Sequence, residues 1–224
     1  MTDAYLAHWR LAVQRITRQV DGDPAAVVRW LGAVQAQDYL AGLWAVGLRT
    51  RDCTEAKVEQ AIADRTIVRT HFMRNTVHLV PPEDLRWMMR LVAPRIRMII
   101  DNIARQGKLG LDESVYAKSN EIIAKALVGG NQMTRPQLAK LLEEAGIATE
   151  GRLTLITQRA QTDGIMCHSV RKGAQYGLAL VDDWLPPGRD LTGEEALAEF
   201  ARLYFRGHGP ATLQDYAWWS GLTL

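Results

Sequence analysis

The feature that most constrains the fold of this chain is a repeated order of hydrophobic patterns. Three helix-like segments followed by a pair of short strand-like segments occur twice. In the first half, apolar residues recur every three or four positions in three segments, 5–16, 24–37 and 54–65. The segment 66–81 then alternates β-branched with polar residues, which predicts two short strands with a turn at Arg74 and Asn75. A long helix, kinked at Pro94, is expected to follow.

The second half repeats the order without evident sequence similarity to the first. Its expected helices are 115–130, 133–147 and 152–164. Thr134, followed three residues later by Gln137, fits a capping box at the start of the second of them. The segment 165–181 reads as a hairpin with a basic loop. Three helices closed by a hairpin are the winged-helix plan, an elaboration of the helix-turn-helix.

We therefore predict a mainly α protein with small β-hairpins (α+β), built from tandem winged-helix (helix-turn-helix) units. The expected domains are 1–110, 116–185 and 192–224, separated by polar, glycine- or proline-bearing linkers. The last domain would hold only the first two helices of a third unit. We therefore expect a piece of a longer protein, with Trp218 and Trp219 left uncovered and open to self-association.

Charge and composition exclude several classes of protein. The net charge is only +2, but 65–105 carries eight Lys or Arg against three acids, which suits an anionic partner or a solvated helix face. Cys53, Cys167 and five scattered histidines predict neither a disulfide framework nor a metal site, and no cofactor is expected. No apolar run approaches 18 residues and no leader is evident, so we expect a cytoplasmic bacterial protein with no membrane partner.

Three stretches resemble the tandem winged-helix DNA glycosylases of the AlkZ/YcaQ type. They are "VQAQD" at 34–38, "RTHFMRNTVHLVPPEDLRWM" at 69–88 and "HGPATLQDYAWWSGL" at 208–222. The resemblance implies three winged helices and a C-terminal β-barrel around a basic channel for double-stranded DNA. It also implies a catalytic Gln-x-Gln motif, here Gln35 and Gln37. The sequence departs from the pattern at Asn75, where glycine is expected, and in lacking the rest of the third unit and the barrel.

The chemistry of an amide limits what the two glutamines can do. An amide takes no proton near neutral pH, but it can orient a water molecule and steady a substrate. That suffices for an alkylated purine, because its positive charge already weakens the glycosidic bond. Residues i and i+2 of a helix point about 200° apart, so both can serve one substrate only if the helix ends near Asp38. Asp38 is a reserve carboxylate, and a structural amide pair is the alternative reading.

Further candidates are residues that could contact DNA. Basic residues flank both predicted hairpins, where wing tips commonly touch phosphates, and polar residues lie on the helix 152–164, which could enter a groove. That helix also carries apolar residues, so part of it must face the core. The DNA-binding candidates are Arg69, Arg74, Thr157, Arg159, Arg171 and Lys172.

Three functional hypotheses follow. The first is a DNA glycosylase that hydrolyses the N-glycosidic bond of alkylated, cationic purines or crosslink adducts through its Gln-x-Gln motif. The second is a non-catalytic winged-helix DNA-binding protein, such as a regulator, in which both glutamines are structural. The third is a fragment that folds and does neither.

Overall fold

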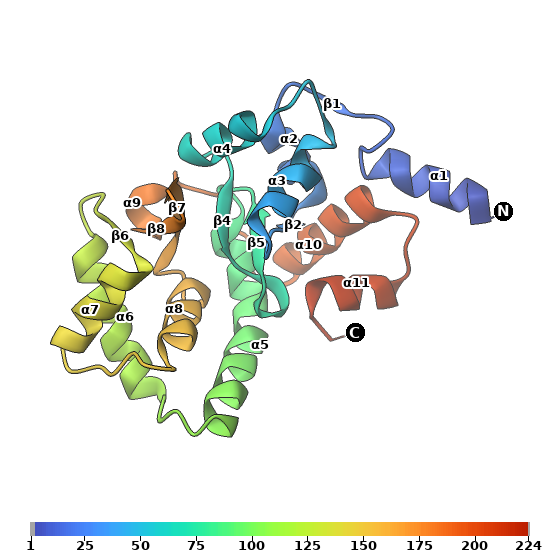
Figure 1. The fold of residues 1–224 in the computed structure, drawn as a ribbon. Helices are drawn as coiled ribbons and strands as arrows, with labels where there is room; N and C mark the ends of the chain where they lie inside the picture. Colours follow the sequence, from blue (N-terminus) through green and yellow to red (C-terminus); the bar gives the residue numbers. More distant parts are fainter. Residues whose placement is uncertain (1–2, 224) are drawn as a thin grey trace.

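A computed structural model describes residues 3–223, with Lys172 described through its backbone alone. Two winged-helix units lie side by side, with a long helix, α5, running between them (Figure 1). The predicted mainly α fold with small antiparallel strands, in the winged-helix class, is confirmed. None of the helices in residues 3–223 combines the length and the apolar character that crossing a membrane requires.

The first unit follows the order helix, strand, two helices, two strands. Its elements are α2 (Pro24–Leu31), β2 (Val34–Gln35), α3 (Tyr39–Gly47), α4 (Glu55–Ala63), β4 (Val68–His71) and β5 (Val77–Val80). The predicted strand pair is confirmed, and a short 3-10 turn, η1 (Met73–Asn75), joins its strands. Arg74 and Asn75 both adopt positive φ there, 54° and 57°.

The second unit has the same order of elements. They are α6 (Glu113–Leu127), β6 (Gln132–Thr134), α7 (Arg135–Glu144), α8 (Leu153–Thr162), β7 (Met166–Lys172) and β8 (Gln175–Leu180). The capping box of Thr134 and Gln137 forms as predicted. In each unit the first strand pairs with the last, β2 with β5 and β6 with β8. The repeat is therefore topological as well as sequential.

One six-stranded sheet joins the two units, in the order β2-β5-β4-β7-β8-β6. The junction is the antiparallel pairing of β4 with β7, where Arg69 lies opposite His168. Helix α5 (Leu85–Gln106) packs against α8, η1 and α10, and it continues without interruption through Pro94. The two units are therefore held together by the pairing of β4 with β7 and by their common packing against α5.

The helix expected over 24–37 is wrong in its second half. Asp23 caps α2 by accepting a hydrogen bond from the Ala25 amide, and Gly32, with φ of 77°, ends the helix. The chain then continues as the strand β2 and the helix α3. The single helix predicted over 24–37 did not distinguish these elements from α2. Since α2, α3 and α4 complete the first unit, the predicted helix 5–16 lies outside it, as α1 (Asp3–Val13) packed on α10.

The remaining elements connect and cover the units. They are β1 (Val20–Asp21), β3 (Thr50–Arg51), α9 (Val181–Trp184), α10 (Gly193–His208) and α11 (Leu213–Ser220). Helix α10 packs against α2 and α5, burying Phe200 and Leu203 in the core. Trp219 packs on the same cluster, contrary to the expectation that both C-terminal tryptophans are uncovered, whereas Trp218 is 75% exposed.

Candidate functional site

Gln35 and Gln37 lie on an extended segment at the end of the sheet. Successive side chains of such a segment point to opposite sides, so residues i and i+2 share a side. Gln35 and Gln37 are exposed, whereas Val34 and Ala36 are buried. The segment therefore presents both amides to solvent on one side, which a continuous helix could not do.

Backbone contacts fix this segment in place. The Ala36 amide donates to the Val77 carbonyl at 2.8 Å, which extends the pairing of β2 with β5. The Gln37 Oε1 accepts from the Val77 amide at 2.9 Å, which turns its NH₂ group away from the strand. Helix α3 packs so closely here that a Cβ atom on Gly42 would lie 2.6 Å from the Ala36 Cβ. The glycine is thus required for this approach.

Asp38, the reserve carboxylate, is engaged as a helix cap. Its Oδ1 accepts from the Ala41 amide at 2.9 Å at the start of α3, and its side chain is exposed. A capping carboxylate orients the helix that follows, which explains why the extended segment stops here.

Gln35 opens onto a cleft of about 280 Å³ between the sheet and α10. Polar and aromatic side chains from four elements surround it, among them Arg74, His78, His208 and Trp219. Neither histidine is a candidate from the sequence, because only the pairing of β2 with β5 and the packing of α10 bring them beside Gln35. No spacing in the sequence signals this proximity.

Burial keeps the cleft histidines neutral at pH 7. Desolvation lowers the pKa of His78 to about 4, partly offset by its hydrogen bond to the Thr76 carbonyl and reinforced by the nearby charge of Arg74. Burial also lowers the pKa of His208, which stacks on Tyr204 with ring centroids 4.8 Å apart. A ligand entering the cleft would therefore meet two uncharged imidazoles beside the guanidinium groups of Arg49 and Arg74.

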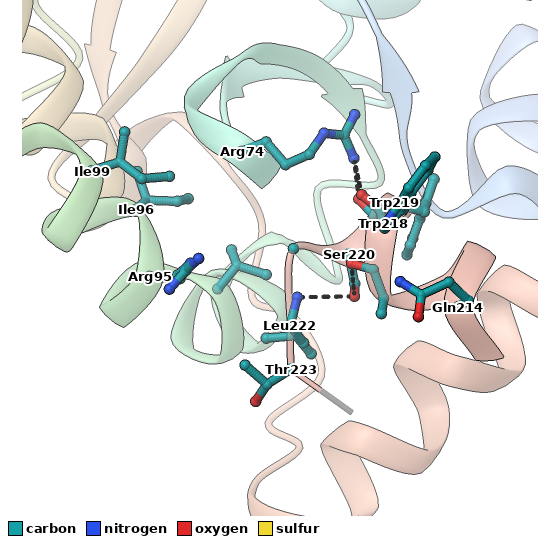
Figure 2. Close-up of a pocket in the computed structure, with 13 residues that line it drawn as sticks. Arg74, Arg95, Ile96, Ile99, Gln214, Trp218, Trp219, Ser220, Leu222 and Thr223 are labelled. Atoms are coloured by element: carbon teal, nitrogen blue, oxygen red, sulfur yellow. Dashed lines mark hydrogen bonds between the residues drawn. The ribbon is translucent and has the colours of Figure 1, made fainter.

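Arg74 separates the cleft from a larger cavity. Its Nη1 donates to the backbone carbonyls of Trp218 and Trp219, and Figure 2 shows the guanidinium directed at this end of α11. The second cavity, of about 880 Å³, lies beyond it between α5 and α11, with Arg95 and Ile99 among its lining residues. Arg74 was expected to contact phosphate, but in this conformation it ties η1 to α11.

Arg69 is buried beneath the glutamine segment rather than displayed on a wing. Its side chain is 5% exposed, and its Nη2 donates to the Ala36 carbonyl at 3.1 Å. The guanidinium lies 4.5 Å from the ring centroid of Tyr176 and 5.5 Å from that of Tyr39. The expected phosphate contact stays a prediction, and in this conformation the residue faces the backbone between the two glutamines.

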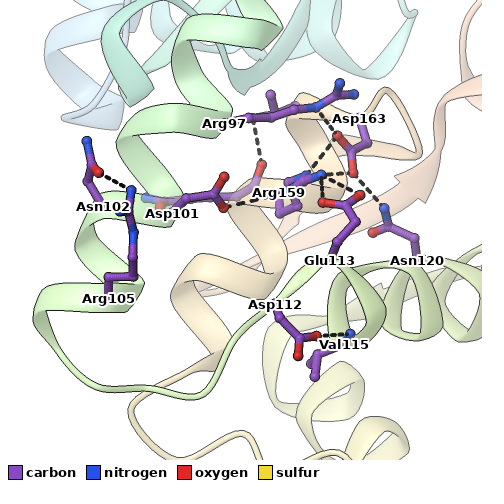
Figure 3. Close-up of polar contacts among 12 residues, drawn as sticks. Arg97, Asp101, Asn102, Arg105, Asp112, Glu113, Val115, Asn120, Arg159 and Asp163 are labelled. Carbon is purple, nitrogen blue, oxygen red and sulfur yellow. Dashed lines mark hydrogen bonds and ion pairs between the residues drawn. The ribbon is translucent and has the colours of Figure 1, made fainter.

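Two further DNA-binding candidates are also buried. Arg159, 4% exposed, forms ion pairs with Glu113, Asp163 and Asp101, which connect α8 to α5 and α6 (Figure 3). The Thr157 hydroxyl donates back to a carbonyl of its own helix. Helix α8 packs against α5, α6 and β4, so in this conformation both side chains face the protein interior, and a role in a DNA groove stays a prediction.

Arg171, at the tip of the second wing, is exposed, as is Arg74 in η1. The Arg171 guanidinium lies 5.2 Å from the ring centroid of Tyr39, so this wing reaches back to the first unit. The side chain of Lys172 lies outside what the structure describes. Within residues 3–223, no group of three or more His, Cys, Asp or Glu is arranged to hold a metal ion.

Comparison with known proteins agrees with this architecture. The sequence profile of the family described as DNA glycosylase AlkZ-like matches residues 28–224. An interstrand DNA cross-link repair glycosylase from Streptomyces sahachiroi is 24% identical over 225 residues, covering 96% of this chain and 59% of that protein. The solved structure of Streptomyces sahachiroi DNA glycosylase AlkZ is similar with a TM-score of 0.79 at 23% identity, covering 95% of this chain and 58% of that one.

The comparisons support conclusions of different scope. The structural similarity, at its low identity, establishes the winged-helix fold, and the chain spans little more than half the length of the curated relative. The profile match extends from within α2 through α11. It includes both glutamines and the aromatic residues of α10. On this match, the chain belongs to the AlkZ-like DNA glycosylase family.

Proposed function

We propose that this chain binds double-stranded DNA and hydrolyses the N-glycosidic bond of alkylated, cationic purines or crosslink adducts. The observation that carries the proposal is the exposure of Gln35 and Gln37 on one side of an extended segment beside a cleft. The family match and the relative's name as an interstrand cross-link repair glycosylase support the same reaction class.

The arrangement suits a leaving group that departs readily. The transition state of glycosidic hydrolysis resembles an oxocarbenium ion, for which enzymes commonly use carboxylates. Here the Gln35 amide lines the cleft, and the Gln37 NH₂ group is turned outward because its oxygen is held by Val77. Two amides can orient a water molecule and the substrate, while the ring charge of the lesion supplies the driving force for departure.

DNA binding is proposed to involve the exposed Arg171 on the second wing. A phosphate contact there would give affinity that depends on salt and not on base sequence. Arg69 and Arg159 are left out of this proposal because both are buried. Self-association through 192–224 stays a prediction, with the exposed Leu213 and Trp218 as its surface.

The test is release of the damaged base from duplex DNA containing N7-methylguanine. We expect the unaltered chain to release the base and Gln37→Ala to lose most of this activity while keeping its duplex affinity. Gln106→Ala, an exposed glutamine at the end of α5, is the matched control and should behave as the unaltered chain.

Retention of full activity in both Gln35→Ala and Gln37→Ala would refute the assignment of the motif. Salt-sensitive duplex binding with no base release would instead favour a non-catalytic winged-helix DNA-binding protein.

A further inference from the structure

Hydrolysis of a glycosidic bond releases a proton from the attacking water, and a group that accepts this proton speeds the step, which neither glutamine can do. The cleft offers His78 directly beside Gln35. The two residues are register partners in the antiparallel pair of β2 and β5. Directly opposed residues of such a pair have Cβ atoms about 5 Å apart and point to the same face. Both line the same cleft.

The hydrogen bonds of His78 fix which ring nitrogen can accept a proton. Its Nδ1 lies 3.0 Å from the Thr76 carbonyl oxygen, which can only accept, so Nδ1 carries the hydrogen. The neutral ring then has its lone pair on Nε2. Phe72 packs edge-on against the imidazole with ring centroids 5.8 Å apart, and the side chain is only 2% exposed. The base is therefore held in one orientation and one tautomer.

We propose that Nε2 of His78 is the general base that takes a proton from the water oriented by Gln35. This inference rests on the proposed glycosylase function. As the C1′–N bond breaks, its electron pair passes to the cationic purine, which leaves neutral. The water oxygen bonds to C1′, and its proton moves to Nε2. The products are an abasic site, the free alkylated base and a protonated His78, which then returns its proton to solvent.

The groups around His78 keep its ring neutral. Arg74 in η1, Arg49 beyond α3, His71 in β4 and His208 in α10 are the titratable groups near it, and no carboxylate is among the residues lining the cleft. The absence of a carboxylate and the burial of the ring together keep His78 unprotonated at neutral pH. A protonated imidazole would lack the lone pair and would add to the positive charge that Arg49 and Arg74 already place at the cleft.

The experiment measures single-turnover release of N7-methylguanine from a duplex. His78→Asn keeps a donor near Nδ1 and removes Nε2, so we expect release to slow by about 100-fold with duplex affinity unchanged. His71→Asn is the matched control, because His71 faces Gln158 and His168 on the other side of β4, and should release base normally.

A rescue measurement separates a proton acceptor from a structural role. Imidazole added to His78→Ala should restore release in proportion to its neutral fraction between pH 6 and 8, a range in which the unaltered chain shows a flat profile. The unaltered chain should also slow in D₂O, because a proton moves in the transition state. An unchanged rate in D₂O would overturn the assignment even if the variants fail to fold.

The outcomes distinguish this inference from the proposed function. Normal release by folded His78→Asn, or a rate unchanged in D₂O, overturns the assignment of His78 and leaves the glycosylase reaction standing. No release by the unaltered chain overturns the reaction and this assignment together.

Discussion

Arg69 shows how one buried residue can organise the segment that carries the two glutamines. Within the described residues it has no ion pair, and burial lowers its pKa. Its stabilisation comes instead from the faces of Tyr39 and Tyr176 and from the Ala36 carbonyl, which lies between Gln35 and Gln37. Because Tyr176 belongs to the second unit, that unit helps position the segment of the first.

Replacing Arg69 with lysine should distinguish the contribution of its positive charge from that of its planar guanidinium group. The lysine keeps the charge but loses the planar group that stacks between the tyrosines and reaches the carbonyl. We expect the free energy of unfolding to fall by about 1–3 kcal/mol, as for a buried hydrogen bond to a charged group. Base release should fall more than duplex affinity does.

Arg65→Lys is the control for Arg69→Lys. Arg65 also stacks on an aromatic ring, that of Trp184 at 4.4 Å, but it is exposed and does not line the cleft. Urea unfolding and base release should be close to those of the unaltered chain. Equal effects of the two substitutions would contradict a positioning role for Arg69.

At the scale of elements, α8 shows why a helix that resembles a recognition helix need not reach DNA. Its polar residues face other elements: Gln161 accepts from the His71 amide in β4, and Arg159 pairs with carboxylates on three helical segments. Asp163 belongs to the same ion-pair network. Its carboxylate also accepts hydrogen bonds from Arg97 of α5 and from Asn120 of α6. Helix α8 is thus the joint between the second unit and α5.

Arg159→Ala should destabilise the protein without changing its DNA contacts. Removing the buried guanidinium loses its charge-assisted hydrogen bonds, worth about 1.5–3 kcal/mol, although Asp163 keeps its bonds from Arg97 and Asn120. We expect a lower urea midpoint and, in conditions where the variant is folded, unchanged duplex affinity. Lys125→Ala, which removes an exposed pair with Glu121, should leave the midpoint in place. Loss of affinity in folded Arg159→Ala would restore a direct DNA role.

At the scale of the whole molecule, the sheet that joins the units is also where buried histidines gather. His71 and His168 lie across the β4–β7 junction with ring centroids 6.2 Å apart, and His78 lies on the neighbouring strand. Burial lowers the pKa of His71 to about 4, lowers that of His78 to the same value, and lowers that of His168 well below its usual range. The junction is therefore built from neutral imidazoles.

Acid should weaken the fold through these histidines. Unfolded histidines titrate near pH 6.5, so between pH 6.5 and about 4 the unfolded chain binds more protons and stability falls as pH falls. Each such histidine contributes up to about 1.4 kcal/mol per pH unit over that interval. Urea unfolding between pH 7 and 5 measures the slope, and His71→Gln should make it shallower. A midpoint independent of pH across this range would contradict the expectation.

The sequence by itself determined most of the local elements and their order, with β2, α3 and β6 among the exceptions. Helix caps such as Asp23 and Thr134, the alternation that makes β4 and β5, and the left-handed turn at Arg74 and Asn75 all depend on near neighbours in the chain. The motif of Gln35 and Gln37 was found in the same way, as a short sequence pattern whose amide groups have few possible chemical roles. Such features are predictable because their physical causes lie within a few residues of one another.

Only the tertiary structure decided what each side chain faces. Periodicity cannot distinguish a helix that continues past Leu31 from one that ends at Gly32 and becomes a strand, because pairing with β5 stabilises the extended form. Burial of Arg69 and Arg159, and the approach of His78 to Gln35, depend on contacts between residues far apart in the chain. Those contacts gain their energy from packing and desolvation of whole elements, which no local pattern records.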